Sequence, residues 1–178
     1  IPVLELQVAS QHKNIDSVSS NKNPTSTTLS SLNAGRDKKA LKLRQWFQNN
    51  FSPEWQLFPV VAPAAYRSVS DEIPTETVIR AKQVNLGDAV TLVLVISLSP
   101  PNEDGEVEIM IKICPCGLTK YLPPGLTITV LDELDDVFEE LQANEEDPWL
   151  GLRFNASEGQ FSIKLTLEEV RVEEKFEI

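Results

Sequence analysis

The clearest pattern of hydrophobic positions lies between residues 89 and 113. Residues 90–98 are almost all apolar and rich in β-branched side chains, which is typical of a strand buried on both faces. Farther on, apolar side chains occupy every second position: Val107, Ile109, Ile111 and Ile113. The intervening prolines and the Asp104-Gly105 pair favour a turn. The sequence therefore predicts a β-hairpin at the centre of a sheet.

Similar alternation recurs in short segments along the rest of the chain. These segments are residues 77–86, 126–130, 150–154, 161–167 and 170–178. Turn residues such as Gly87-Asp88 and Pro123-Pro124-Gly125 separate them. Short strands at this spacing predict a mainly β fold, either an antiparallel β-sandwich or an open barrel.

One segment before these strands has helical periodicity. Leu43, Trp46 and Phe47 lie at the spacing of one helix face, and Asp37 suits an N-cap. We therefore expect one N-terminal helix over residues 37–49, packed on the sheet by the aromatic side chains just beyond it, Phe51, Trp55 and Phe58. The basic side chains around its start suggest a solvated face that also meets the acidic sheet of the same molecule.

Residues 132–142 fit two structures. Their apolar side chains have helical spacing: Leu134, Val137, Phe138 and Leu141. A hairpin that turns at Asp135-Asp136 fits equally well, and periodicity alone does not choose between them.

The composition divides the chain into three parts. Residues 1–9 alternate as a short edge strand does, with Pro2 near the start. Residues 10–35 are rich in Ser, Thr and Asn, which predicts a flexible connection because so few apolar groups offset the cost of ordering. Residues 36–178 form the β-sandwich domain with its leading helix. A sequence that begins without Met and without a leader pattern suggests a fragment or a processed chain.

The acidic charge lies almost entirely in the second half of the chain. The net charge is −11, and residues 100–178 carry 6 basic and 19 acidic side chains. Such a surface disfavours nucleic acid and favours a protein partner, in particular a basic one. The simpler alternative is that the acidic side chains keep a sheet-rich protein soluble and protect its edges. No apolar run reaches the length of a membrane span, so we expect no membrane contact and a cytoplasmic location.

Candidate chemistry is sparse. The single histidine, His12, lies in the polar connection, so the usual activated-nucleophile arrangements are unavailable. The only cysteines, Cys114 and Cys116, supply half the ligands of a metal site, and we expect them to be reduced and to point to opposite faces. Nine acidic side chains in residues 132–147 suit a solvated surface better than glycoside hydrolysis or calcium binding. We therefore expect no enzyme activity, no cofactor and no metal.

Two functions remain as hypotheses. The first is a non-catalytic protein-interaction domain that uses its acidic face or an exposed edge, with Asp135, Asp136, Glu139 and Glu140 in the contact surface. The second is a carbohydrate- or small-ligand-binding module, in which Trp149 and Tyr121 form an aromatic platform.

The order of several short motifs resembles a known family. The motifs are Leu43-Arg44-Gln45-Trp46-Phe47-Gln48-Asn49, Arg80-Ala81-Lys82 with Asn85-Leu86-Gly87, Tyr121-Leu122-Pro123-Pro124-Gly125-Leu126 running into Val130-Leu131-Asp132-Glu133, and Glu158-Gly159-Gln160-Phe161 with Glu174-Lys175-Phe176-Glu177-Ile178. Together they resemble a cyanobacterial family catalogued as domain of unknown function 1822, over about residues 40–178.

The resemblance implies that this chain is the C-terminal portion of a longer protein. It implies no established activity, and its members' occurrence beside signalling and transcription-regulating proteins suggests a regulatory or adaptor role. Similar sequences tend to have a glycine turn after the motif ending at Glu133, which favours the hairpin there, although Asp135 and Asp136 replace the glycine in this chain.

Overall fold

A computed structural model describes residues 39–58 and 76–178. These residues all belong to one compact unit, Gly35–Ile178. The edge strand expected at residues 1–9, the flexible connection expected at 10–35, Asp37 and His12 lie outside the described residues.

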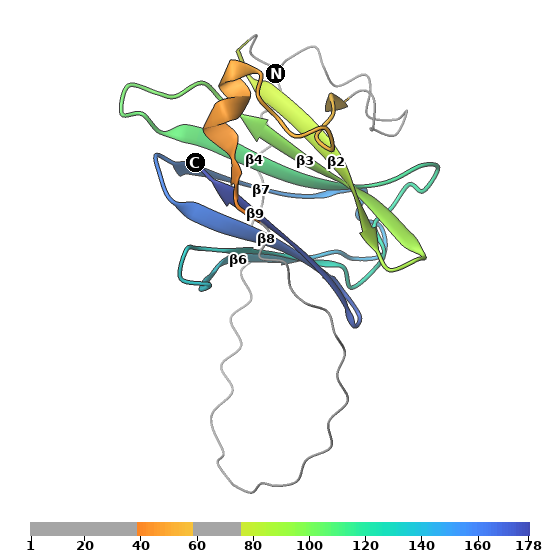
Figure 1. The fold of residues 1–178 in the computed structure, drawn as a ribbon. Coiled ribbons are helices and arrows are strands. Elements are labelled where there is room, and N and C mark those ends of the chain that lie inside the picture. The colour runs from red at the N-terminus through yellow and green to blue at the C-terminus, as the bar shows by residue number, and fades with distance from the viewer. Residues whose placement is uncertain (1–38, 59–75) are drawn as a thin grey trace, which may run out of the picture. The chain divides into compact units, whose positions relative to one another are not determined.

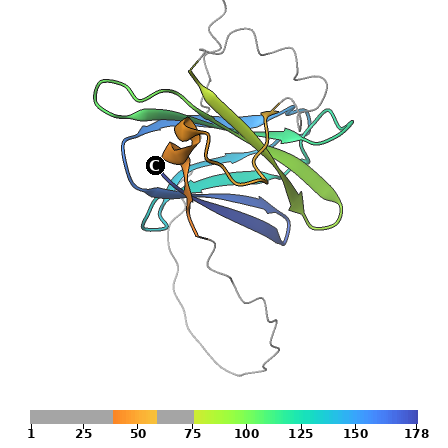
Figure 2. The same ribbon diagram turned by 45° about the horizontal axis from the view of Figure 1, so that its top comes forward.

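The described residues form two β-sheets, seen as two layers in Figures 1 and 2. The five-stranded sheet has the order β1-β9-β8-β5-β6 and the four-stranded sheet the order β2-β3-β4-β7. The strands are β1 (Leu41–Lys42), β2 (Val78–Leu86), β3 (Val90–Leu98), β4 (Val107–Pro115), β5 (Thr127–Leu131), β6 (Val137–Gln142), β7 (Leu150–Ala156), β8 (Gln160–Leu167) and β9 (Val170–Glu177). All neighbours are antiparallel except β1 and β9. The mainly β prediction is confirmed, and the sheets do not close into the barrel that was the alternative.

The predicted central hairpin is confirmed. Strands β3 and β4 pair with each other in the middle of the four-stranded sheet, with Leu94 opposite Ile113 and Ile96 opposite Ile111. These four side chains are fully buried between the two sheets. From the facing sheet, Ile128, Ile163 and Leu165 enter the same apolar cluster. Burial of this shared core therefore holds the two layers together.

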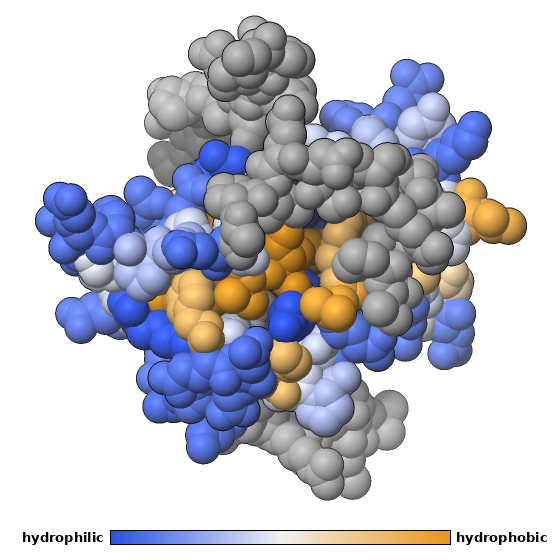
Figure 3. Space-filling model, turned by 90° about the horizontal axis from the view of Figure 1, so that it is seen from above, coloured by the Kyte–Doolittle hydropathy of each residue, from blue (hydrophilic) through white to orange (hydrophobic). Residues whose placement is uncertain are grey.

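The outer face of the four-stranded sheet carries a second apolar cluster. Val93, Val95 and Ala81 are buried there together with Cys114, and Figure 3 shows hydrophobic side chains on this side of the molecule. Because neighbouring residues of a strand point to opposite faces, the continuous apolar run of β3 supplies both clusters. The prediction of a strand buried on both faces is confirmed.

The two cysteines lie on the same side of the sheet. Cys114 is a buried member of the outer cluster and Cys116 packs against it, and both are free thiols. The expectation of opposite faces was wrong, because residues two positions apart in a strand share a face.

The predicted helix over residues 37–49 is much shorter than expected. Leu41–Lys42 form β1, which pairs in parallel with Phe176–Glu177, and only Leu43–Gln48 form a helix, the 3-10 helix η1. Pairing with the edge of the five-stranded sheet outweighs helical periodicity in the first residues of this segment. In a 3-10 helix side chains three positions apart share a face, and Leu43 and Trp46 are both buried in this way. In the described residues no helix has the length and apolar character needed to cross a membrane.

Basic side chains at η1 are engaged within the domain. The Lys42 ammonium group lies 3.2 Å from the Glu177 carboxylate. Arg44 donates hydrogen bonds to the backbone carbonyl groups of Gly105 and Ser157, which lie in two different loops. Arg44 therefore fastens η1 to the β3–β4 and β7–β8 connections.

An ion pair joins the two sheets where β2 faces β9. The Lys82 ammonium group lies 3.0 Å from Glu174 and 3.2 Å from Glu54. The side chains of Lys82 and Glu174 are each only 14% exposed. Both lie on core-facing positions, since Lys82 is opposite Leu94 and Glu174 is opposite Ile163. The pair closes this side of the sandwich, and the Trp55 ring lies beneath the ammonium group.

We expect Lys82→Met to lower the free energy of unfolding by about 1–3 kcal/mol, because the largely buried Glu174 carboxylate loses its contact with the Lys82 ammonium group. The matched control is Lys175→Met, which removes an exposed pair with Glu173 and should change stability by less than about 0.5 kcal/mol. Urea unfolding of both variants measures the difference. Equal effects would show that the inter-sheet pair contributes no more than a surface contact.

Candidate functional site

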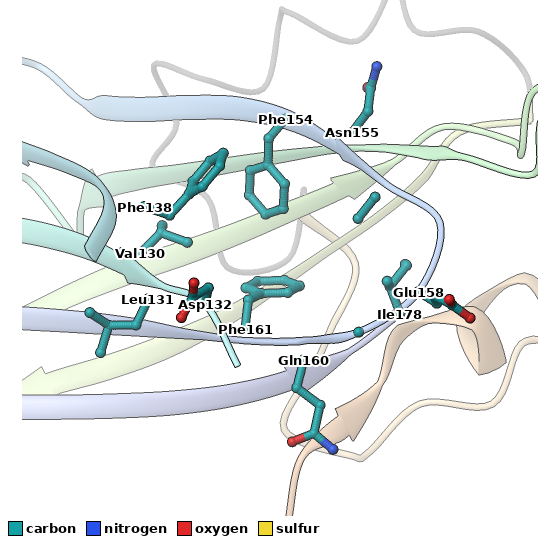
Figure 4. A pocket seen from close by; sticks show the side chains of 12 residues that line it. Val130, Leu131, Asp132, Phe138, Phe154, Asn155, Glu158, Gln160, Phe161 and Ile178 are labelled. Atoms are coloured by element: carbon teal, nitrogen blue, oxygen red, sulfur yellow. The ribbon is translucent and has the colours of Figure 1, made fainter. Parts of the chain in front are cut away.

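The opposite side of the sandwich, where β6 faces β7, contains a pocket of about 180 Å³. Its apolar lining includes Val130 and Phe161 from the five-stranded sheet, Ile178 just after β9, and Phe154 from the four-stranded sheet. In Figure 4 the rings of Phe138 and Phe154 face each other above the ring of Phe161. The pocket is therefore an aromatic hollow between the two sheets.

The aromatic lining of the pocket is supported from behind. Phe138 meets Phe154 with ring centroids 5.5 Å apart, and Phe154 meets Phe161 at 5.2 Å. Phe161 stacks on Phe176, whose ring also contacts Trp55. Edge-to-face and stacked contacts of this kind fix ring orientation. A continuous line of rings thus runs from the pocket through the core toward η1.

A β-bulge directs Phe138 into the pocket. Val130 pairs with Glu139, but the next residue, Leu131, pairs with Val137, so Phe138 is an extra residue on β6. In a regular ladder Phe138 would lie opposite Leu131, whose side chain is on the other face of β5 from that of the core residue Val130. Bulges change the direction of a side chain in this way. The bulge therefore places an aromatic ring at the opening between the sheets.

The turn that precedes β6 is tight and is held by one carboxylate. Asp132 Oδ1 accepts hydrogen bonds from the backbone N–H groups of Leu134, at 2.8 Å, and Asp136, at 3.0 Å. Asp135 has a positive φ of 63°, as expected for the last residue of a three-residue hairpin loop. The hairpin alternative for residues 132–142 is confirmed, and the helical alternative is wrong. Long-range pairing with β5 outweighs the helical spacing of the apolar side chains.

Three large apolar side chains of this hairpin are exposed. Leu134 is 76% exposed, Val137 62% and Phe138 58%. Of these three side chains, only Phe138 lines the pocket; Leu134 lies in the turn, and Val137 is paired with Leu131. We call these three side chains and the pocket the hairpin surface. Exposed apolar patches next to a hollow are typical of binding sites.

The four acidic residues predicted for an interaction surface all lie on this hairpin. Asp135 and Asp136 are in the turn, and Glu139 and Glu140 are on β6. Glu140 also accepts a hydrogen bond from the Thr129 hydroxyl across the ladder, at 2.9 Å. Two further carboxylates, Asp132 and Glu158, line the pocket. The hairpin surface therefore combines exposed apolar side chains with several carboxylates.

The aromatic pair predicted as a platform lies elsewhere. Tyr121 is in the β4–β5 connection, and Trp149 immediately precedes β7. Trp149 packs on the outer cluster, and the Lys112 ammonium group lies over its ring, 4.3 Å from the centroid. Gly151 makes room for that ring, since a Cβ there would be 3.1 Å from Trp149 Cζ3. Intramolecular contacts thus already use the Trp149 ring, and among the described residues no ring contact joins it to Tyr121.

The pocket residues Phe138, Phe154 and Phe161 were not predicted as a site. The alternation of β7 and β8 indicates only that Phe154 and Phe161 face a core. One signal was present in the sequence, because the adjacent Val137 and Phe138 interrupt the alternation expected of a strand.

Groups suited to catalysis or metal binding are scarce in the described residues. Burial raises the pKa of the Cys114 thiol to about 11, so this thiol stays protonated and weakly nucleophilic near neutral pH. No group of three or more His, Cys, Asp or Glu side chains in residues 39–58 and 76–178 is arranged to hold a metal ion.

Comparison with known proteins identifies the family. A family model described as a protein of unknown function, DUF1822, matches residues 20–177, which is most of the chain. The chain belongs to the DUF1822 family. The resemblance seen in the sequence motifs is therefore confirmed, and these DUF1822 residues include both sheets and the hairpin surface. No curated protein and no solved structure matches the chain.

We expect Asp135→Gly to raise the free energy of unfolding of this DUF1822 chain by up to about 1 kcal/mol. Glycine adopts a positive φ without the steric cost that a side chain brings, and the substitution removes one charge from a crowded acidic turn. Thermal unfolding measures the change. The control is Asp136→Gly, because the backbone of Asp136 does not have a positive φ. A larger gain from the control would contradict the role assigned to the Asp135 backbone.

Proposed function

We propose that this domain is a non-catalytic protein-interaction module with a regulatory or adaptor role, and that it binds its partner through the hairpin surface. The observation that carries the proposal is the exposure of Leu134, Val137 and Phe138 on one hairpin, of which Phe138 also lines an aromatic pocket. Contact of three large apolar side chains with water is unfavourable, and a partner that covers them removes that contact and gains free energy of binding.

The acidic side chains around this surface support a protein partner, preferably a basic one, and argue against nucleic acid. Nine acidic side chains and no basic ones lie between Asp132 and Asp147. A phosphate backbone would be repelled by this field, whereas lysine and arginine side chains would be attracted to it. We propose a cytoplasmic location, since free thiols such as Cys114 and Cys116 persist in a reducing compartment.

A capture experiment with matched surface variants tests the proposal. The full chain, immobilised, is incubated with a lysate of the cells from which it comes, in three forms: wild type, Leu134→Ser and Leu118→Ser. Both leucines are exposed, but Leu118 lies in the β4–β5 connection and does not belong to the hairpin. We expect one or more proteins to be retained by wild type and Leu118→Ser and lost, by about tenfold or more, from Leu134→Ser.

Two results would contradict the proposal. One is that no protein is retained by wild type at low or at high salt. The other is that the retained proteins bind Leu134→Ser as well as they bind wild type, which would place any contact outside the hairpin surface. Thermal unfolding of each variant verifies that the fold is intact.

A further inference from the structure

We infer that the hairpin surface binds an extended, basic segment of another protein, which places one apolar side chain in the aromatic pocket and pairs as a strand with β6. This inference rests on the interaction role proposed above and specifies the chemistry of the partner. Three independent features of the described residues carry it: the size of the pocket, the free edge of β6 and the sign of the charge.

The pocket has the size of a single side chain. Its volume of about 180 Å³ is below the roughly 300–1,000 Å³ of sites that enclose small molecules. Its lining is mostly apolar, with the rings of Phe138, Phe154 and Phe161 turned inward (Figure 4). A hollow of this size and character suits an aliphatic or aromatic side chain presented by a polypeptide.

The edge of β6 is available for pairing. β6 is the last strand of the five-stranded sheet, so its outer side has no strand neighbour among the described residues. The backbone of Ala143 bonds toward β5, since its N–H donates to Leu126 and its carbonyl accepts from Gly125. By the alternation of an antiparallel ladder, the backbone groups of Gln142 and Glu140 face away from β5. Extended peptides bind to edges of this kind by adding a strand.

The charge at this edge selects the partner. A second copy of this chain paired along β6 would place Glu139 and Glu140 against the same residues of its neighbour, which is unfavourable. Glu139 is paired with Val130, which lines the pocket, so it lies on the pocket face of β6, and Glu140 lies on the other face. A segment with lysine or arginine at alternate positions would instead place its cations on the pocket face, next to Glu139, Asp132 and Glu158.

Protection of a free edge does not account for all of these features. Charged side chains on an edge strand discourage aggregation, and Glu139 and Glu140 serve that purpose. The same hairpin nevertheless exposes Val137 and Phe138, and the bulge turns Phe138 toward the pocket. A strand selected only against association would have polar side chains at these positions.

Synthetic peptides test the inference on the full chain. The probe is a fluorescent nine-residue peptide with alternating lysine and threonine and a central phenylalanine. Companion peptides replace the central phenylalanine by serine, or all lysines by glutamate. We expect the probe to bind about tenfold or more tightly than either companion, with an affinity that falls as salt is raised. We also expect binding to be lost in Phe138→Ser and kept in Leu118→Ser, and the amide hydrogens of β6 to exchange more slowly in the complex.

Several outcomes would overturn the inference. Equal binding of the phenylalanine and serine peptides would show that the pocket is not an anchor, and unchanged exchange in β6 would exclude strand pairing. Sedimentation that shows a dimer of wild type, dissociated by Phe138→Ser, would assign the surface to a second copy. If a protein captured through Leu134 binds without any basic segment, the interaction role stands and this inference fails. Thermal unfolding of Phe138→Ser verifies that loss of binding is not loss of folding.

Discussion

Burial of the β3–β4 hairpin between the two sheets is the interaction on which the rest of the structure depends. Ile96, Ile111 and their neighbours are fully enclosed, and the facing sheet contributes Ile128, Ile163 and Leu165 to the same cluster. The two sides of this sandwich differ in how they are completed. Where β2 faces β9, the Lys82–Glu174 ion pair and Trp55 close the gap. Where β6 faces β7, the sheets meet through Phe138 and Phe154 and leave a pocket.

A single backbone irregularity produces the character of the second side. The extra residue on β6 turns Phe138 toward Phe154, and the tight turn held by Asp132 fixes where β6 begins. The line of rings from Phe138 through Phe154, Phe161 and Phe176 supports the pocket from the core. Local backbone geometry and core packing therefore both determine the hairpin surface, and the function proposed for it follows from its exposure and charge.

The sequence predicts most of the sheets because alternation with a period of two is strong in β4, β7 and β8, and because β3 is a continuous apolar run of strand length. Prediction from the sequence fails for residues 37–49, because Leu41–Lys42 pair with Phe176–Glu177. Local periodicity gives no information about a pairing between segments so far apart in the sequence. For residues 132–142 the helical and strand patterns are equally good, and only the pairing with β5 decides. The four acidic residues between Asp135 and Glu140 lie on one hairpin, as their closeness in sequence implies. The pocket could not be predicted, because it requires a bulge and the approach of Phe138 to Phe154 from a different sheet.

Among the described residues, the outer edge of β6 has no strand neighbour, whereas the β3–β4 hairpin is buried in the core. Residue-resolved hydrogen–deuterium exchange of the unbound full chain tests this difference most directly. We predict that the amide hydrogens of β3 and β4 exchange most slowly. The amide hydrogens of Glu140 and Gln142 face away from β5, and we predict that they exchange among the fastest of all strand residues. Protection of Glu140 and Gln142 equal to that of β3 would contradict it, because that edge would then already be covered.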